Sequence, residues 1–135
     1  MKVRDIMSRD VQVARSTDSL REVAARMKAG DFGFMPVTED DRLIGTVTDR
    51  DLVVRGLADG RAPDGDIGPC VSRDLKTVRD GDDLQAVLDS MGGAQIRRLP
   101  VLDADDRLVG VVSLGDLADR VKERHVGETL EAISR

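Results

Sequence analysis

Hydrophobic and polar positions follow the same pattern twice along the chain. In each half a short apolar lead-in, residues 3–7 or 66–71, precedes a short extended segment, Val11–Ala14 or Leu75–Val78. Apolar residues then recur at i, i+3, i+4 and i+7, which predicts an amphipathic helix. The stripes are Leu20, Val23, Ala24 and Met27 in the first half and Leu84, Val87, Leu88 and Met91 in the second. Ser19 and Glu22 have capping-box spacing and support a helix start after Ser19.

Two strands are predicted after each helix. The apolar runs are Phe34–Thr38 and Leu43–Thr48 in the first half, and Arg98–Leu102 and Leu108–Ser113 in the second. Each pair flanks a compact acidic turn, which is typical of a β-hairpin. A second helix is expected to begin near Asp49 and near Leu114. The order β-α-β-β-α in each half predicts an α/β (α+β) fold with small mixed sheets.

The two halves are copies of one unit. Ser8-Arg9-Asp10 recurs as Ser72-Arg73-Asp74, 64 residues later, and the spacing becomes 65 where Asp41-Arg42-Leu43 recurs as Asp106-Arg107-Leu108. Two copies of this length predict two half-domains related by a pseudo-two-fold axis, and small ligands usually bind in clefts between packed units. The expected bounds are 1–58 for the first repeat, 59–65 for a linker, 66–121 for the second repeat and 122–135 for a tail. The Gly- and Pro-rich segment 57–69 reads as a linker without an element of its own, and the tail as either a short docking helix or a solvated end.

Composition narrows the function classes. The net charge is −5, no long basic run is present, and the aromatic residues are two Phe with no Trp or Tyr, so we expect no nucleic-acid partner. Cys70 is the single cysteine, which excludes an internal disulfide and a cysteine-based metal cluster; we expect no metal. No apolar run reaches the roughly 18 residues of a membrane span, so we expect no membrane partner and a soluble, cytoplasmic protein.

The junction between the second hairpin strand and the second helix carries the candidate chemistry. The pattern G-x-x-[ST]-x-x-D occurs at matched places in both copies, as Gly45, Thr48 and Asp51 and as Gly110, Ser113 and Asp116. A helix start attracts phosphate, a hydroxyl adds a donor, and a carboxylate suits the paired hydroxyls of a ribose. Helix capping alone explains either copy by itself. The presence of the whole G-x-x-[ST]-x-x-D pattern in both copies favours a ribose-phosphate site.

These motifs resemble a tandem pair of CBS (cystathionine-β-synthase) domains, a Bateman module, over roughly residues 1–121. The residues that carry the resemblance are Asp5-Ile6-Met7, the two Pro-Val pairs, the two Asp-Arg-Leu-x-Gly turns and the two Gly-to-Asp motifs. In residues 45–57 the chain is similar to short stand-alone bacterial CBS-pair proteins of the stress or hypoxic-response type. The resemblance implies an adenine nucleotide ligand (AMP, ADP or ATP), a homodimer and a regulated partner protein.

The resemblance also assigns roles to residues. Asp51 and Asp116 would hold ribose and Thr48 and Ser113 would contact phosphate. The pocket wall would include Phe34 and Met35 in the first copy and Arg97, Arg98 and Leu99 in the second. Val3 and Ile6 of the lead-in Val3–Ile6 would lie against the adenine of the Asp116 site. Val71 would lie against the adenine of the Asp51 site.

The two copies differ in charge at this wall. Arg97 and Arg98 supply two cations that make strong contacts with phosphate, whereas the equivalent Gly33 and Phe34 supply none. We therefore expect the Asp116 site to bind phosphates better, while the Asp51 site could still use Arg97 from across the cleft. Arg50 lies beside the ribose carboxylate Asp51, and a solvated surface arginine is an equally good reading of it.

Three function classes follow. The first is a regulatory module that binds an adenosine compound. The alternative is a homodimeric assembly module with vestigial clefts, for which Leu52, Val53, Leu117 and Val121 are candidate interface residues; they suit an internal core equally well. An enzyme is the weakest reading, because no Ser-His-Asp, Cys-His or metal set is present; we expect no catalytic residue and no catalytic cofactor. We read His125 as a surface residue, and Cys70 as a buried thiol with a redox role as the lesser alternative.

Overall fold

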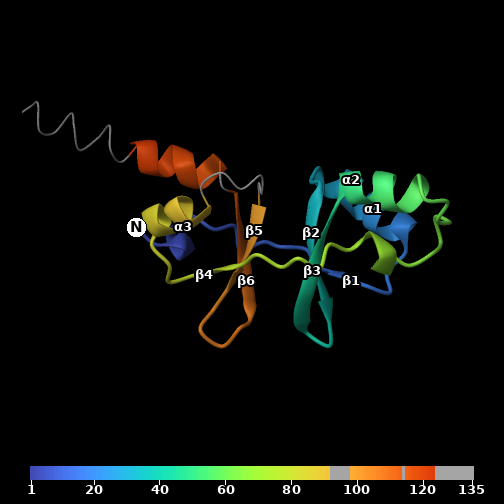
Figure 1. Ribbon diagram of the computed structural model, residues 1–135, viewed down its shortest axis with the longest axis horizontal. Coiled ribbons are helices and arrows are strands. Elements are labelled where there is room, and N and C mark those ends of the chain that lie inside the picture. Colours follow the sequence, from blue (N-terminus) through green and yellow to red (C-terminus); the bar gives the residue numbers. More distant parts are fainter. Residues whose placement is uncertain (92–97, 114, 124–135) are drawn as a thin grey trace, which may run out of the picture. The chain divides into compact units, whose positions relative to one another are not determined.

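The computed structural model describes residues 1–91, 98–113 and 115–123, and the chain divides into two compact units (Figure 1). Residues 11–75 form one, which we name the inner unit. Residues 1–10 and the chain from residue 76 onward form the other, the outer unit. Each unit therefore takes its lead-in from the opposite repeat: the first lead-in belongs to the outer unit and the second lead-in to the inner unit.

The inner unit is a three-stranded sheet with helices packed against it (Figure 1). Its elements in chain order are β1 (Ala14–Arg15), α1 (Leu20–Gly30), β2 (Phe34–Glu39), β3 (Arg42–Thr48), α2 (Asp49–Asp51), the π-helix η2 (Leu52–Leu57) and the 3-10 turn η3 (Gly68–Cys70). Strand β1 pairs with β2 in parallel, and β2 pairs with β3 in antiparallel. The sheet is therefore mixed, as the sequence predicts.

The outer unit repeats this plan. Its elements are η1 (Val3–Asp5), β4 (Val78–Arg79), α3 (Leu84–Met91), β5 (Arg98–Leu102) and β6 (Leu108–Ser113), followed by helical residues 115–123. Strand β4 is parallel to β5, and β5 is antiparallel to β6. Both hairpins carry a register shift at the same place, after Val37 and after Val101. The mixed α+β fold predicted from the sequence is confirmed.

Several element bounds differ from the prediction. The strand before the first helix of each repeat has only two residues. It begins at the last residue of the predicted run, Ala14 or Val78, and ends one residue beyond the run, at Arg15 or Arg79. The 3-10 turn η3 overlaps the end of the segment 57–69, which was expected to have no element of its own, but lies outside the linker 59–65. Ile67 and Cys70 are buried and pack this turn against the core. The predicted cap of α1 is present, since Ser19 Oγ accepts a hydrogen bond from Glu22 N at 3.0 Å.

Aliphatic side chains form a separate core in each unit. Leu20, Val23 and Met27 of α1 pack in the inner core, whereas Ala24, predicted in the same stripe, is exposed. In α3 the predicted stripe places Leu84 and Val87 in the outer core. The side chain of Met91 and the tail 124–135, including His125, lie outside the described residues.

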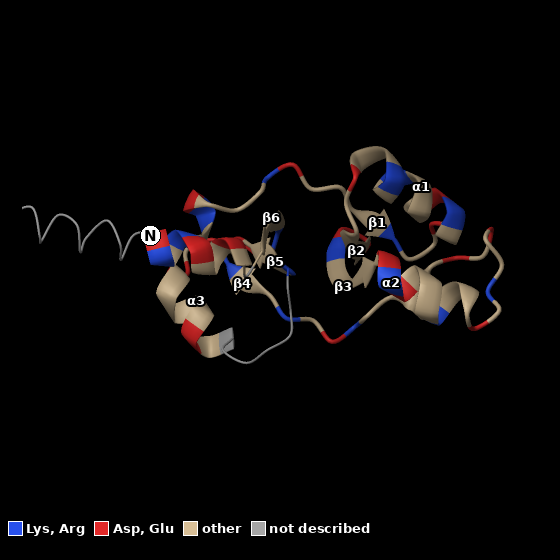
Figure 2. Cartoon of the chain, turned by 90° about the horizontal axis from the view of Figure 1, so that it is seen from above, with Lys and Arg blue, Asp and Glu red and all other residues tan. Residues whose placement is uncertain are grey.

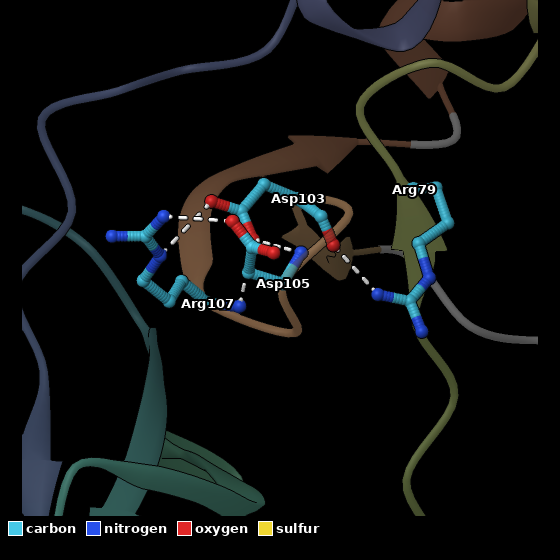
Figure 3. A network of polar contacts seen from close by, with 4 residues as sticks. All are labelled: Arg79, Asp103, Asp105 and Arg107. Atoms are coloured by element: carbon cyan, nitrogen blue, oxygen red, sulfur yellow. Dashed lines mark hydrogen bonds and ion pairs between the residues drawn. The ribbon is translucent and has the colours of Figure 1, made fainter.

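The two hairpins turn differently. Asp40 and Asp41 both have positive φ, 47° and 62°, which is the backbone of a tight two-residue hairpin loop. The second hairpin has one more residue, and Asp106, which matches Asp41, again has a φ of 62°. The carboxylate of Asp103 closes this longer turn by accepting from Asp105 N at 2.8 Å and from Arg107 N at 2.9 Å (Figure 3). These hydrogen bonds, the largest from Arg107 N, lower the pKa of Asp103.

The side chain of Arg79 ties β4 to the same turn. Its Nη1 donates to the Asp103 carbonyl oxygen (Figure 3). Its Nη2 forms an ion pair with Asp106. Arg15 occupies the matching position in the inner unit, where a hollow of about 500 Å³ lies between residues 15–17 and 38–41. This hollow is at the turn end of the hairpin, away from the end at which Thr48 and the second helix lie.

Each lead-in crosses the last strand of its unit at a glycine. In the inner unit Thr46 N donates to Ser72 O at 3.0 Å and Ser72 N donates to Thr46 O at 2.8 Å. In the outer unit Ser8 and Val111 make the same pair of hydrogen bonds, at 2.9 and 3.0 Å. A Cβ placed on Gly45 would lie 2.3 Å from Ser72 O. The glycine is therefore needed because another backbone lies where its side chain would be.

We expect Gly45→Ala to destabilise the chain by about 1–3 kcal/mol, since the lead-in must move away from β3. Thermal and urea unfolding would measure the loss. Gly81→Ala is the matched control: a Cβ at Gly81 meets nothing within 4 Å, so its free energy of unfolding should change by less than about 0.5 kcal/mol. Equal effects of the two substitutions would contradict the crossing as the reason for Gly45.

Candidate functional site

The candidate residues of the inner unit come together where β3 meets α2. Gly45 and Thr48 lie on β3, and Asp51 is the third residue of α2. Phe34, at the start of β2, is the cross-strand partner of Thr48. Because directly opposite residues point to the same face of a sheet, Phe34 and Thr48 stand side by side. The inner site therefore presents an aromatic ring, a hydroxyl and a carboxylate.

Thr48 and Asp51 form a reciprocal capping box. Thr48 Oγ1 accepts from Asp51 N at 3.1 Å, and Asp51 Oδ2 accepts from Thr48 N at 2.9 Å. Both side chains are half-buried. The cap leaves the hydroxyl proton of Thr48 and the second carboxylate oxygen of Asp51 without partners among the described residues. Capping and ligand binding are therefore compatible, because a hydroxyl can accept and donate at once and a carboxylate has several acceptor positions.

The first turn of α2 carries alternating charges (Figure 2). Asp49 N donates to Gly33 O at 3.0 Å, and a Cβ placed on Gly33 would lie 2.7 Å from Asp49 Oδ2. The Asp49 carboxylate is thus held against the residue that precedes Phe34. Arg50 is exposed, and its backbone N–H donates to Asp49 Oδ1 at 2.9 Å. Arg50 was predicted as a site residue and Asp49 was not. The stretch Thr48-Asp49-Arg50-Asp51 differs from Ser113-Leu114-Gly115-Asp116 by both of these charges, which are opposite in sign.

The outer site has the same frame with different groups. Ser113 ends β6, and Arg98 on β5 is its cross-strand partner, as Phe34 is of Thr48. The hydrogen bond from Asp116 N to Ser113 Oγ is long, at 3.4 Å, and both Arg98 and Asp116 are exposed. Within the described ranges the Asp116 carboxylate has no polar partner. The outer site therefore combines a guanidinium, a hydroxyl and a carboxylate that its own cap does not engage. Arg97 lies outside the described residues.

Some lead-in residues pack in the cores and others on the glycines of these motifs. Val3 and Val71 are buried in the cores, and Ile6 is half-buried. Val71 packs on Gly45, with its Cγ1 2.6 Å from where a Cβ would be, and Met7 packs on Gly110 in the same way. Met7 was not among the predicted site residues, although the 64-residue spacing of the repeat pairs it with Val71.

Two further expectations, on the pocket wall and on the interface, depend on which residues are buried. Met35 and Leu99, expected in the pocket wall, are fully buried core residues. They directly precede the Pro-Val pairs, in strand stretches buried on both sides. Of the expected interface residues, Leu52 and Leu117 are buried in their own units and Val121 packs on the outer core, which leaves Val53 exposed.

Cys70 is buried, and burial raises the pKa of its thiol. A buried, protonated thiol has the environment of a structural cysteine. In the part of the chain that the structure describes, no group of three or more His, Cys, Asp or Glu is placed to hold a metal ion. Within the same ranges, no helix has the length and apolar character needed to cross a membrane.

The capping geometry predicts different costs for removing the two hydroxyls. Thr48→Ala should destabilise the chain by about 1 kcal/mol, because Asp51 N loses its acceptor. Ser113→Ala should cost less, since its hydrogen bond is already long. Urea unfolding measures both values, and Thr48→Ser, which keeps the hydroxyl, is the control. A larger loss for Ser113→Ala than for Thr48→Ala would show that the cap geometry is misassigned.

Comparisons with known proteins identify the family to which the chain belongs. The family model described as CBS domain matches twice, over residues 3–56 and 65–123. Hypoxic response protein 1 of Mycobacterium tuberculosis is 36% identical over 132 residues, covering 96% of this chain and 92% of that one.

Two solved structures are similar to this chain. The crystal structure of Hypoxic Response Protein I with two coordinated zinc ions is 36% identical, with a TM-score of 0.76, and covers 88% of this chain and 98% of that one. The structure of CBSX2 in complex with AMP is 23% identical, with a TM-score of 0.77 and coverage of 92% and 98%, and so shows the fold alone. On the family match and the identity to Hypoxic response protein 1, this chain belongs to the CBS-domain family as a tandem pair.

Proposed function

We propose that this protein is a regulatory module that binds an adenine nucleotide of the AMP, ADP or ATP type and acts on a partner protein. The observation that carries the proposal is the outer site. Arg98 stands opposite Ser113, and Asp116 follows three residues later with its carboxylate unengaged by the described residues. The family match supports a regulatory rather than a catalytic role.

Each group of the outer site has a matching part in a nucleotide. The Asp116 carboxylate accepts hydrogen bonds from the two ribose hydroxyls, and Ser113 Oγ donates to a phosphate oxygen. The Arg98 guanidinium, exposed in the free protein, pairs with the phosphate, where charge-assisted contacts are strong. Arg97, adjacent in sequence, adds a second cation to the proposal. No step needs a general acid, a base or a metal.

The lead-ins and glycines complete the proposed sites. Gly45 and Gly110 let the lead-ins cross beside the hydroxyls. In the proposal Val3 and Ile6 support the adenine in the outer site, and Val71 does so in the inner site; of these, the half-buried Ile6 has surface left for contact. Thr48, Asp51, Phe34 and Arg50 form the matching inner site. The two repeats are taken as 1–58 and 66–121, with linker 59–65 and tail 122–135.

One similar protein supports the proposed ligand class and another supports the proposed biological role. CBSX2, which shares the fold, has been solved with AMP. The name Hypoxic response protein 1 supports a role in a stress response. Binding regulates a partner only through different affinities for two states of the module, so the proposal includes a partner that distinguishes the bound from the free form.

We expect nucleotide-free protein to bind AMP, ADP or ATP in a calorimetric titration. Asp116→Ala should remove the tighter site, and Arg98→Ala should weaken AMP at least about tenfold, the size of one lost charge-assisted contact. Asp119→Ala is the matched control, because Asp119 is exposed on the same helix one turn further and should leave binding unchanged. Unaltered binding in Asp116→Ala would contradict the site assignment, and silence of the wild type across all three nucleotides would contradict the function.

A second candidate function, a homodimeric assembly module, is favoured by a specific surface. Val53, Val54 and Leu57 of η2 are 55%, 45% and 59% exposed. Their spacing over one wide turn of the π-helix places them on its outward side. Apolar side chains gathered in this way mark an interaction surface, and we propose that a second copy covers it.

The dimer has its own test. Sedimentation velocity of the wild type should give a dimer, and the double variant Val53→Asp with Leu57→Asp should give a monomer with unchanged far-UV circular dichroism. The control Val54→Ala removes less apolar surface and should leave most of the dimer. A wild-type monomer at all concentrations would refute the assembly role.

A further inference from the structure

The hollow at the turn end of the inner hairpin is lined by groups of both charges. It measures about 500 Å³, and residues 15–17 and 38–41 supply one guanidinium, three carboxylates and three hydroxyls. This volume is within the range of small-molecule sites. Because the carboxylates outnumber the guanidinium, the lining disfavours a phosphate and favours a ligand whose net charge is positive.

The matching turn of the outer unit shows which group this position binds. Asp106 matches Asp41, and both residues have a φ of 62°. The Asp106 carboxylate forms an ion pair with Arg79, and Nη1 of Arg79 donates to the Asp103 carbonyl oxygen at 2.6 Å (Figure 3). In the second copy of the repeat, a guanidinium is therefore held at this turn.

The inner unit does not make the matching contact. Arg15 matches Arg79, and the hydrogen bond that Arg15 donates comes from its backbone N–H, to Asp18 Oδ2 at 2.9 Å. Among the described residues, neither the guanidinium of Arg15 nor the carboxylate of Asp41 has a polar partner, although both line the hollow. The hollow therefore offers a cation and an anion that the protein does not pair with each other.

A short hydrogen bond fixes a third group in the lining. Ser16 Oγ donates to Glu39 Oε1 at 2.6 Å, which joins the residue after β1 to the last residue of β2. Within the described ranges the other carboxylate oxygen of Glu39 has no partner. Thr17 and Thr38 add hydroxyls, which can donate and accept. The lining can therefore bind one carboxylate, at Arg15, and more than one cation.

From these contacts we infer that the hollow of the inner unit is a binding site for a basic amino acid, with L-arginine as the type case. The guanidinium of the ligand pairs with Asp41, as that of Arg79 pairs with Asp106 in the outer unit. The α-carboxylate pairs with Arg15, and the α-ammonium group with the Glu39 carboxylate. The inference goes beyond the proposed nucleotide function, because the hollow is at the other end of the hairpin from Thr48.

The test compares three probes that differ by one charged group at a time. Agmatine is arginine without the α-carboxylate, and L-citrulline has an uncharged ureido group in place of the guanidinium. In chemical-shift titrations of the ¹⁵N-labelled full-length protein, L-arginine should shift the amides of Ser16, Thr38 and Asp41 with a Kd of about 1 mM or tighter. Agmatine and citrulline should each bind at least about tenfold more weakly, as the loss of one charge-assisted contact requires.

Two variants assign each end of the ligand. Asp41→Asn, tolerated because Asn accepts a positive φ, should reduce the preference for arginine over citrulline to less than about twofold and preserve the preference over agmatine. Arg15→Gln should do the reverse. Asp31→Asn is the matched control, because Asp31 also has a positive φ, 53°, and does not line the hollow; it should change neither preference. Circular dichroism verifies folding, and Asp41→Gly replaces Asp41→Asn if that variant does not fold.

Several outcomes would overturn the inference. They are a wild type without saturable shifts at the hollow, citrulline or agmatine bound as tightly as arginine, and a preference that survives in the variant meant to remove it. The proposed function would stand in each case, since it is read from AMP binding and from Asp116→Ala. Failure of AMP to bind would in turn leave the arginine result unaffected.

Discussion

The architecture depends on a backbone crossing that occurs once in each unit. Ser72 pairs with Thr46 through two hydrogen bonds, and Ser8 pairs with Val111 in the same way. Gly45 and Gly110 make room for these crossings, since a side chain at either would meet the lead-in backbone or side chain. Each crossing inserts a lead-in into a unit whose hairpin comes from the other repeat. The two repeats are therefore tied to one another by the chain itself, and neither completes its core without the other.

The same strand that receives the lead-in ends at the candidate site. Two residues beyond Thr46 the chain reaches Thr48, whose hydroxyl caps the helix that carries Asp51. A residue that organises the fold is thus also a residue of the proposed ligand site. Among the described residues, the cap uses one oxygen of Asp51 and the acceptor side of the hydroxyl, so the groups proposed to bind a ligand have a fixed orientation. In the outer unit the longer hydrogen bond at Ser113 and the exposed Arg98 make a looser site with a cation.

Periodicity and the repeat predict most of this fold. The hairpin strands Arg98–Leu102 and Leu108–Ser113 have the predicted bounds, and Ser19 caps the first helix as predicted. The parts that could not be predicted depend on contacts between distant segments. Of the predicted run Val11–Ala14, only Ala14 pairs with β2, and the pairing continues to Arg15 beyond the run. Ala24 is exposed although it lies in the predicted apolar stripe. The exchange of lead-ins between the repeats has no signal in the local sequence. It depends on long-range pairing, in which Ser8 bonds to Val111 and Ser72 bonds to Thr46.

The candidate sites show a similar division. The motif spacing identified Thr48, Asp51, Ser113 and Asp116, but the strand register was needed to place Phe34 and Arg98 opposite the hydroxyls. The contact between the Asp49 carboxylate and Gly33 also depends on the fold and has no signal in the sequence.

The most direct test of the account is a chemical-shift titration of ¹⁵N-labelled protein with AMP. The account predicts that the amides of Arg98, Ser113 and Asp116 shift first and saturate together. Larger shifts at the hollow near Ser16 and Asp41, with Ser113 and Asp116 unmoved, would contradict it and place the ligand at the opposite end of the hairpin.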